Sequence, residues 1–235
     1  MLNILYEDEH VLAVDKPAGL LVIPGREPAE RTLRDEVTDY LAPGGQRPYV
    51  VHRLDRGTSG VVLFARTAEA HRALNLSFDG HEVEKVYLAL VTGDLEGEDV
   101  IKAMLHTARR GRMRPARQSE MGLKSMTRWK AIERFGRFTL LEVRPETGRA
   151  HQIRVHLKFI GHPLAFDPSY GRKQSLTARD LNPDAPKDIV LTRSPLHAAS
   201  IRLPHPSGKG TLFVEAPLPN DFARALKVLR RSQYS

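Results

Sequence analysis

The chain is built from short apolar runs separated by turns rich in glycine, proline or acidic residues. Residues 4–5 and 11–14 flank an acidic turn, and residues 201–203 and 211–216 flank a turn with proline and glycine, as in β-hairpins. Further strand-like runs are residues 60–66, 83–91, 125–135 and 137–144. Many short strands joined mostly by hairpins predict an α+β fold with a mixed, mostly antiparallel sheet.

Helices are expected to flank this sheet where apolar side chains recur at helical spacing. The spacing predicts them over residues 32–41, 67–80, 150–160 and 221–231. Thr32 is a suitable N-cap for the first, and Gly161 followed by Pro163 ends the third. Residues 167–187, rich in Asp, Pro and Ser, are predicted to form a surface loop.

The length of 235 residues, 41% of them hydrophobic, suits one large domain or two small ones. Neither a linker nor a repeat is evident, so we predict a single catalytic domain over residues 1–235. The sequence has no apolar run long enough to cross a membrane, and Glu7, Asp8 and Glu9 interrupt the first apolar stretch, which argues against a signal peptide. We therefore expect a cytoplasmic protein.

The absence of cysteine excludes disulfides, thiolate metal sites, iron–sulfur clusters and thiol nucleophiles. His151 and His156 are five residues apart with Arg154 between them, whereas zinc ligation from one helix face uses a spacing of four. We therefore predict no metal site. The chain also lacks the glycine motifs that bind nucleotide cofactors and the G-x-S-x-G motif of serine hydrolases.

The charge is basic overall and uneven along the chain. The formal net charge is +8, from 36 Lys and Arg against 28 Asp and Glu. Within residues 101–124, seven basic residues face a single acid, Glu120; they are Lys102, Arg109, Arg110, Arg112, Arg114, Arg117 and Lys124. A solvated loop is one interpretation, and a loop that binds phosphates through arginine is the other. The composition favours RNA or DNA over a membrane, because no basic amphipathic helix is evident.

One segment, residues 51–60, reads V-H-R-L-D-R-G-T-S-G. The residues after Asp55 predict a tight turn between two strands, which would hold its carboxylate at a sheet edge. If the chain up to Asp55 is extended, Arg53 and Asp55 project from the same face. A surface Arg–Asp pair is the simpler interpretation. A second segment rich in Arg and His, residues 148–154, offers Arg154 as a partner and favours a functional site.

Residues 52–60, H-R-L-D-x-x-T-S-G, resemble the signature of the RluA-type pseudouridine synthases, which isomerise uridine in structured RNA. The resemblance extends over residues 1–220. The family's opening strand and turn, its K-x-Y-x-A strand, its third motif and a late active-site stretch are matched by residues 6–20, 85–89, 147–157 and 196–198. Asp15 stands where many members have Asn, and Ala150 where Thr or Ser is usual.

The resemblance implies a fold with a central RNA-binding cleft and a reaction without metal or cofactor. A uridine is flipped out of the RNA, its glycosidic bond is broken, and the uracil is rejoined through carbon. The resemblance assigns the nucleophile to Asp55, its ion-pair partner to Arg154 and stacking on the target base to Tyr87. It assigns insertion into the RNA to Arg53. Lys85, on the same strand face as Tyr87, would contact RNA phosphate or support the structure.

These roles agree with the chemistry of the side chains. Burial alone would raise the pKa of Asp55, so a cation is needed to keep it ionised, and a guanidinium does not deprotonate. The arginines from Arg109 to Arg117 would position phosphates without selecting sequence. His52, His151 and His156 are expected to orient loops rather than to transfer protons.

Structured RNA, ribosomal RNA or a transfer RNA stem-loop, is the expected partner of a monomer that has no separate N-terminal RNA-binding domain. Residues 20–26 are most similar to the family member that modifies both kinds of RNA. Two alternatives stay open: a glycosylase, which would release the base, and a non-catalytic RNA-binding module, which would have no use for Asp55 with Arg154.

Overall fold

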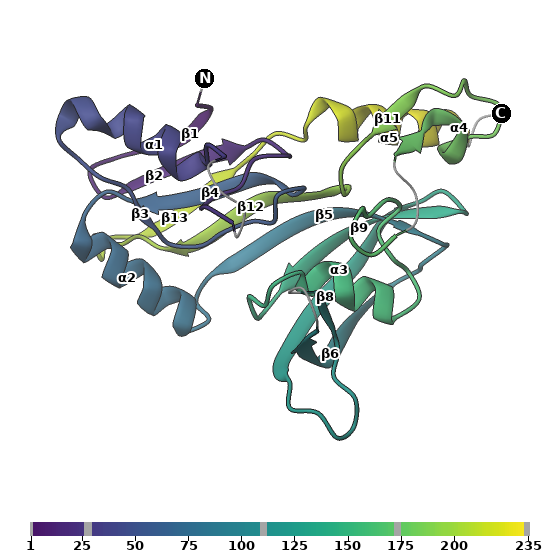
Figure 1. The fold of residues 1–235 in the computed structure, drawn as a ribbon, viewed down its shortest axis with the longest axis horizontal. Helices are drawn as coiled ribbons and strands as arrows, with labels where there is room; N and C mark the ends of the chain where they lie inside the picture. The colour runs from purple at the N-terminus through teal and green to yellow at the C-terminus, as the bar shows by residue number, and fades with distance from the viewer. Residues whose placement is uncertain (1, 26–29, 109–111, 172–174, 233–235) are drawn as a thin grey trace. The chain divides into compact units, whose positions relative to one another are not determined.

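A computed structural model describes residues 2–25, 30–108, 112–171 and 175–232. The chain divides into two compact units, and each unit is made from two segments of the sequence (Figure 1). The first contains Met1–Lys85 and Ala198–Pro217, and the second contains Val86–His197 and Leu218–Ser235. The single catalytic domain over residues 1–235 stays a prediction.

The first unit is a sheet with helices. Its strand order is β1-β2-β4-β12, with β3 beside β4 and β13 beside β12. The pairs β1–β2, β2–β4, β3–β4 and β12–β13 are antiparallel. The elements are β1 (Ile4–Glu7), β2 (Val11–Lys16), α1 (Leu33–Leu41), the 3-10 helix η1 (Ala42–Gly44), β3 (Tyr49–Val50), β4 (Ser59–Ala65), α2 (Ala68–Asp79), β12 (Leu196–Pro204, within this unit from Ala198) and β13 (Thr211–Glu215).

The core of the first unit lies between α2 and one face of the sheet. Leu74 of α2 is fully buried and belongs to a cluster with Leu63 of β4 and Leu203 of β12. Gly60 has a φ of +112°, and a Cβ there would lie 2.1 Å from the carbonyl oxygen of Ala198. Only glycine therefore allows β4 to begin this close to β12.

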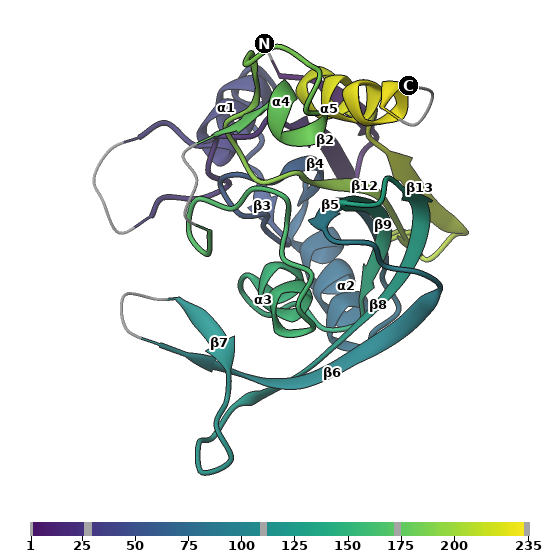
Figure 2. The same cartoon turned by 90° about the vertical axis from the view of Figure 1, so that its right-hand side faces the viewer.

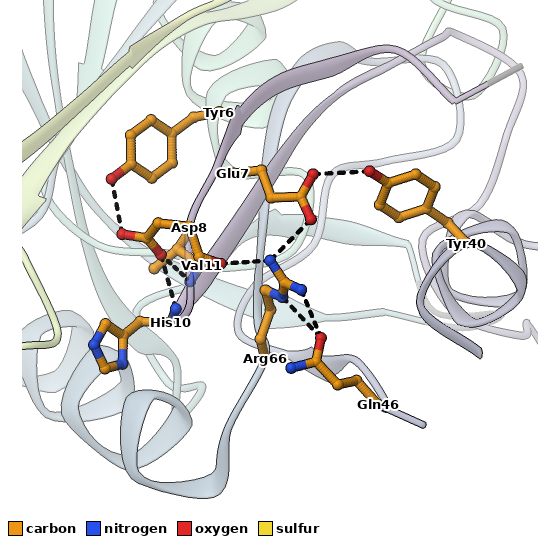
Figure 3. A network of polar contacts seen from close by, with 8 residues as sticks. All are labelled: Tyr6, Glu7, Asp8, His10, Val11, Tyr40, Gln46 and Arg66. Carbon is orange, nitrogen blue, oxygen red and sulfur yellow. Dashed lines mark hydrogen bonds and ion pairs between the residues drawn. The ribbon is translucent and has the colours of Figure 1, made fainter. Parts of the chain in front are cut away.

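A polar network joins the β1–β2 turn to α1 and to the end of β4 (Figure 3). Arg66 donates to Glu7 Oε1 at 2.8 Å, to the Asp8 carbonyl at 2.5 Å, and through two nitrogens to Gln46 Oε1 at 3.0 and 2.6 Å. Tyr40 donates to the other carboxylate oxygen of Glu7 at 2.8 Å. One guanidinium thus ties three separate segments of the first unit together.

The second unit is built on a sheet with the order β5-β9-β8-β6-β7, whose pairs are antiparallel. A short pair, β10–β11, and three helices accompany this sheet in the described ranges. The strands of the sheet are labelled in Figure 2. The elements are β5 (Glu84–Thr92, within this unit from Val86), β6 (Glu98–Thr107), β7 (Met113–Pro115), β8 (Leu123–Arg134), β9 (Phe138–Pro145), α3 (Gln152–Phe159), β10 (Leu176–Thr177), α4 (Ala178–Leu181), β11 (Ile189–Leu191) and α5 (Asn220–Arg231).

Both faces of β5 and β9 are covered in the second unit. Val91 and Leu141 pack with Leu157 of α3 on one side. Leu90 packs with Phe222 of α5 on the other. None of the helices in the described ranges combines the length and the apolar character needed to span a bilayer.

Two sequence predictions are wrong in part. Residues 101–124 are not one loop: β6, β7 and the start of β8 occupy much of the segment, and Ile101 and Leu105 are buried. Ile101, Ala103 and Leu105 share one face of the strand, but the apolar Met104 on the other face hides the polar alternation in the sequence. Residues 167–187 are not a plain surface loop either, because they include β10, α4 and the buried Asp167.

Candidate active site

Asp55 lies in the turn that connects β3 to β4. The N–H of Thr58 donates to the carbonyl of Asp55 at 3.0 Å and closes the turn. The carbonyl of Arg56 accepts from the N–H of Gly19 at 2.7 Å, which joins the turn to the loop after β2. The predicted turn after Asp55 is therefore confirmed, and its backbone is attached to a second loop.

Lys16, at the end of β2, reinforces this attachment from inside the first unit. Its side chain is fully buried, and Nζ donates to the carbonyls of Pro17 at 2.8 Å, Leu20 at 2.7 Å and Arg56 at 3.3 Å. A buried ammonium is tolerated only where acceptors converge on it. Sequence reasoning missed this role, because a lysine at the end of a strand resembles a surface residue.

His52 anchors the segment before Asp55 to β4. Its Nε2 accepts the N–H of Leu63 at 3.0 Å, and its ring stacks on Phe78 with centroids 5.2 Å apart. Burial, together with the nearby Lys85 ammonium, lowers the pKa of His52 to about 3. The imidazole is therefore neutral at physiological pH and orients the segment, as the sequence predicted.

Arg53 and Lys85 are the other candidate residues of the first unit. Arg53 is exposed, and within the described ranges it makes no ion pair, whereas the neighbouring Leu54 is buried and fixes the segment. Lys85 is partly buried with Nζ 5.8 Å from the centroid of the Phe78 ring, and burial lowers its pKa. Arg53 is thus directed to solvent, and Lys85 rests on an aromatic ring.

Arg154 belongs to α3 of the second unit, where only 6% of its side chain is exposed. Its Nε and Nη2 donate to the two carboxylate oxygens of Asp167 at 2.8 and 2.7 Å. Burial alone would raise the pKa of Asp167, but the hydrogen bonds and the charge of Arg154 lower it below its ordinary value. Sequence reasoning identified Arg154 and missed Asp167. The pairing of Arg154 with Asp55 stays a prediction.

Tyr87 lies on β5, opposite Val143 of β9. It is partly buried and packs against the apolar cluster that includes Ala89 and Ile153 of α3. Its ring is therefore supported from the interior of the second unit.

The basic segment of the second unit is heterogeneous. Arg114 forms a two-point ion pair with Glu120, both bonds 2.6 Å long, and these bonds lower the pKa of Glu120 to about 2. Its charge is thus largely satisfied within the protein, whereas Arg112 and Arg117 are exposed. Arg26, Arg109 and Arg110 lie outside the described residues.

Residues 10–159 match the model of a family described as RNA pseudouridylate synthase. The chain belongs to this family. It is an RNA pseudouridine synthase, an isomerase, and the matched range contains Asp55, Tyr87 and Arg154.

Similarity to curated pseudouridine synthases extends over the whole chain. Ribosomal large subunit pseudouridine synthase D of Nitrosomonas europaea is 41% identical over 239 residues, which cover 100% of this chain and 67% of that protein. Synthase C of Salmonella typhimurium is 38% identical over 235 residues, covering 98% and 70%. The solved structure of human RNA pseudouridylate synthase domain containing 4 covers 97% of this chain and 93% of its own, with a TM-score of 0.78 and 24% identity. This likeness confirms the predicted α+β fold.

His151 and His156, whose spacing does not suit zinc, have hydrogen-bond partners within this pseudouridine synthase. Nδ1 of His151 lies 2.7 Å from the hydroxyl of Tyr170, and Nδ1 of His156 lies 2.9 Å from that of Thr127. Burial lowers the pKa of His156 to about 4. Both side chains therefore hold neighbouring segments, which is the orienting role predicted for them.

Proposed function

We propose that this pseudouridine synthase modifies uridines of large-subunit ribosomal RNA, with a transfer RNA stem-loop as a second candidate substrate. The names of the relatives from Nitrosomonas europaea and Salmonella typhimurium support ribosomal RNA. The likeness of residues 20–26 to the family member of dual specificity supports transfer RNA. The net charge of +8 suits a polyanionic partner.

The observation that carries the catalytic proposal is the anchored turn that presents Asp55. Carboxylates act as nucleophiles at glycosidic carbons, and a uridine flipped out of its helix would bring its glycosidic bond within reach. The neutral His52 beside the turn supports assigning the chemistry to the carboxylate, since an imidazole with a pKa of about 3 is a poor acid or base near neutral pH. Asp55 is the catalytic nucleophile of this proposal, with attack on the sugar or on the base both open.

Arg154 and Tyr87 complete the proposed chemistry. Arg154 would be the ion-pair partner of Asp55 and would fix the orientation of its carboxylate, and the two hydrogen bonds to Asp167 would hold the guanidinium in one direction for that role. Tyr87 would stack on the flipped uracil, and its packing against the core of the second unit supports a rigid platform.

The residues proposed to contact RNA differ in exposure and in whether their charge is already paired within the protein. The exposed Arg53 would occupy the space left by the flipped base. Arg112 and Arg117 would bind phosphates together with Arg109 and Arg110, and Lys85 would make a separate contact with RNA. Arg114 is a weaker candidate, because Glu120 already accepts from its guanidinium. We further propose that the protein acts as a cytoplasmic monomer.

Incubation with RNA carrying tritium at C5 of uridine tests the function. Rejoining the uracil through C5 displaces that hydrogen, so the proposal predicts release of tritium to water without release of free uracil. A large-subunit ribosomal RNA fragment and a transfer RNA stem-loop serve as parallel substrates. Free uracil would indicate a glycosylase, and binding without any change of the nucleotide would indicate a binding module. Carbodiimide mapping of pseudouridine in total RNA, with and without the gene, then identifies the position.

A further inference from the structure

Tyr170 contacts three parts of the second unit through one side chain. Its hydroxyl oxygen accepts the N–H of Met113 at 3.0 Å, at the first residue of β7. The same hydroxyl lies 2.7 Å from Nδ1 of His151, the residue before α3. Its ring centroid is 5.0 Å from Cζ of Arg154. Tyr170 therefore links the strand of the basic segment to the start of α3 and to the guanidinium of Arg154.

Asp167 fixes the position of Tyr170. Its Oδ1 accepts the backbone N–H groups of Ser169 at 2.9 Å and of Tyr170 at 3.1 Å, in addition to Nη2 of Arg154. The carbonyl of Asp167 accepts the N–H of Gly171 at 2.7 Å. The Asp167 carboxylate that orients Arg154 thus also closes the turn that carries Tyr170. Asp167 therefore holds Arg154 and Tyr170 in fixed positions relative to each other.

The backbone is strained at His151, which contacts the Tyr170 hydroxyl. His151 has a φ of +53°, a left-handed conformation that costs a β-carbon residue roughly 1 kcal/mol or more. The start of α3 has no side-chain hydrogen bond to cap it. The contact with the Tyr170 hydroxyl helps to hold His151 in this conformation, and strained residues cluster where geometry matters for function.

We propose that Asp167 and Tyr170 are positioning residues for Arg154, and that the Tyr170 hydroxyl couples the basic segment at β7 to the orientation of that arginine. The inference rests on the role proposed above for Arg154. When RNA binds Arg112 or Arg117, it fixes the position of the adjacent strand β7. The hydrogen bond from Met113 then fixes the Tyr170 side chain, whose ring contacts the Arg154 guanidinium. Arg154 is then held most rigidly in the RNA complex, where a misplaced charge would slow the reaction.

Tyr170→Phe is the most selective test, because it deletes both hydroxyl contacts and keeps the ring against Arg154. We expect the single-turnover rate of pseudouridine formation to fall roughly 10- to 100-fold, while the Kd for RNA changes less than about threefold. Tyr6→Phe is the matched control: it deletes a partly buried hydroxyl that donates to Asp8 at 2.8 Å in the first unit. We expect that variant to keep the wild-type rate. A purely structural role of Tyr170 would lower Tm and leave the rate of the folded enzyme unchanged.

The coupling is tested by a double-mutant cycle between Tyr170→Phe and Arg112→Ala, read in the single-turnover rate. In the wild-type background we expect Arg112→Ala to lower both affinity and rate, and in the Tyr170→Phe background to lower affinity alone. Additive effects on the rate would overturn the coupling.

Two further variants separate this inference from the function on which it rests. Asp167→Asn replaces one acceptor by an amide NH₂ facing Arg154, and we expect it to lower the rate as Tyr170→Phe does. A slow Arg154→Lys enzyme together with normal rates for Tyr170→Phe and Asp167→Asn would overturn the positioning inference alone. A normal rate for Arg154→Lys would overturn the role of Arg154 and this inference with it.

Discussion

Arg154 shows how a single residue can be identified from sequence while its surroundings cannot. A guanidinium that is only 6% exposed requires an opposite charge, and Asp167 supplies one thirteen residues further along the chain. In the sequence, Asp167 opens a stretch rich in Asp and Pro that has the composition of a loop. Its role follows from the fold, which brings that stretch back to α3.

Arg154→Lys should impair turnover severely although the charge is conserved. Lysine cannot make the two parallel bonds that Asp167 accepts, and its point charge would be held in a less defined orientation. Single-turnover pseudouridine formation is measured beside filter binding on the same RNA. A variant that keeps its turnover and mainly loses affinity would identify Arg154 as a phosphate contact instead.

His52 makes the stability of the protein depend on pH. Its pKa is lowered to about 3, so below its ordinary value of 6.5 the unfolded chain binds a proton that the folded protein does not. The contribution of this group to stability is therefore complete above pH 6.5 and is lost as the pH falls toward 3, by up to about 1.4 kcal/mol per pH unit. His156, with a pKa of about 4, acts in the same direction.

His52→Gln keeps an acceptor for the N–H of Leu63 but cannot titrate. We expect the free energy of unfolding, measured by urea denaturation from about pH 7 to pH 5, to fall less steeply for this variant than for the wild type. Equal slopes would mean that His52 is protonated in the folded protein.

At the scale of elements, helices and hairpins could be predicted from sequence where their own residues specify them. Thr32 caps α1 and forms a capping box with Asp35, as its position before an apolar periodic segment predicts. The β8–β9 and β12–β13 hairpins are confirmed for the same reason. β6 was not predicted, because the exposed but apolar Met104 interrupts the alternation of polar and apolar residues between Ile101 and Leu105.

Distant contacts set the limit of sequence reasoning. Lys16 is buried because carbonyl groups from its own loop and from Arg56, forty residues away, converge on it. The attachment of the Asp55 turn to that loop could not be predicted from either segment alone. The motif therefore identified Asp55 as the proposed nucleophile, but not the contacts that hold its turn.

The network around Arg66 predicts a stability effect confined to the first unit (Figure 3). Arg66→Ala removes bonds to Glu7, to the Asp8 carbonyl and to Gln46 from a side chain that is 17% exposed. We expect a loss of about 1–3 kcal/mol in the free energy of unfolding, because bonds to a charged group are among the stronger ones. Urea denaturation measures the loss.

Arg66→Lys is the matched control, because it keeps the charge near Glu7 but not the two-nitrogen contact with Gln46. Its free energy of unfolding should lie between that of the wild type and that of Arg66→Ala. A loss below about 0.5 kcal/mol in the alanine variant would place this network among surface ion pairs of little net effect.

At the scale of the whole molecule, charge is distributed unequally along the chain. Residues 1–50 contain nine acidic and five basic residues, whereas residues 101–124 contain seven basic residues and one acidic residue. RNA affinity should fall steeply with salt, since each phosphate neutralised by the basic segment releases condensed counterions.

Replacing both Arg112 and Arg117 by alanine should flatten the slope of log affinity against log salt by roughly one to two units. The matched control removes two exposed cations from helices, Arg72 of α2 and Lys227 of α5, and should leave the slope near that of the wild type. Filter binding over a salt series measures the slope for both variants and for the wild type. If the Arg112 and Arg117 variant has the wild-type slope, the basic segment is a solvated surface without phosphate contacts.

The most direct test of the account is pseudouridine formation by Asp55→Asn. The amide keeps the size of the side chain but cannot act as an anionic nucleophile. We expect RNA affinity within several-fold of the wild type and single-turnover formation reduced by several orders of magnitude. Appreciable turnover by a preparation in which mass spectrometry finds Asn and no Asp at this position would contradict it, and would move the chemistry to another residue.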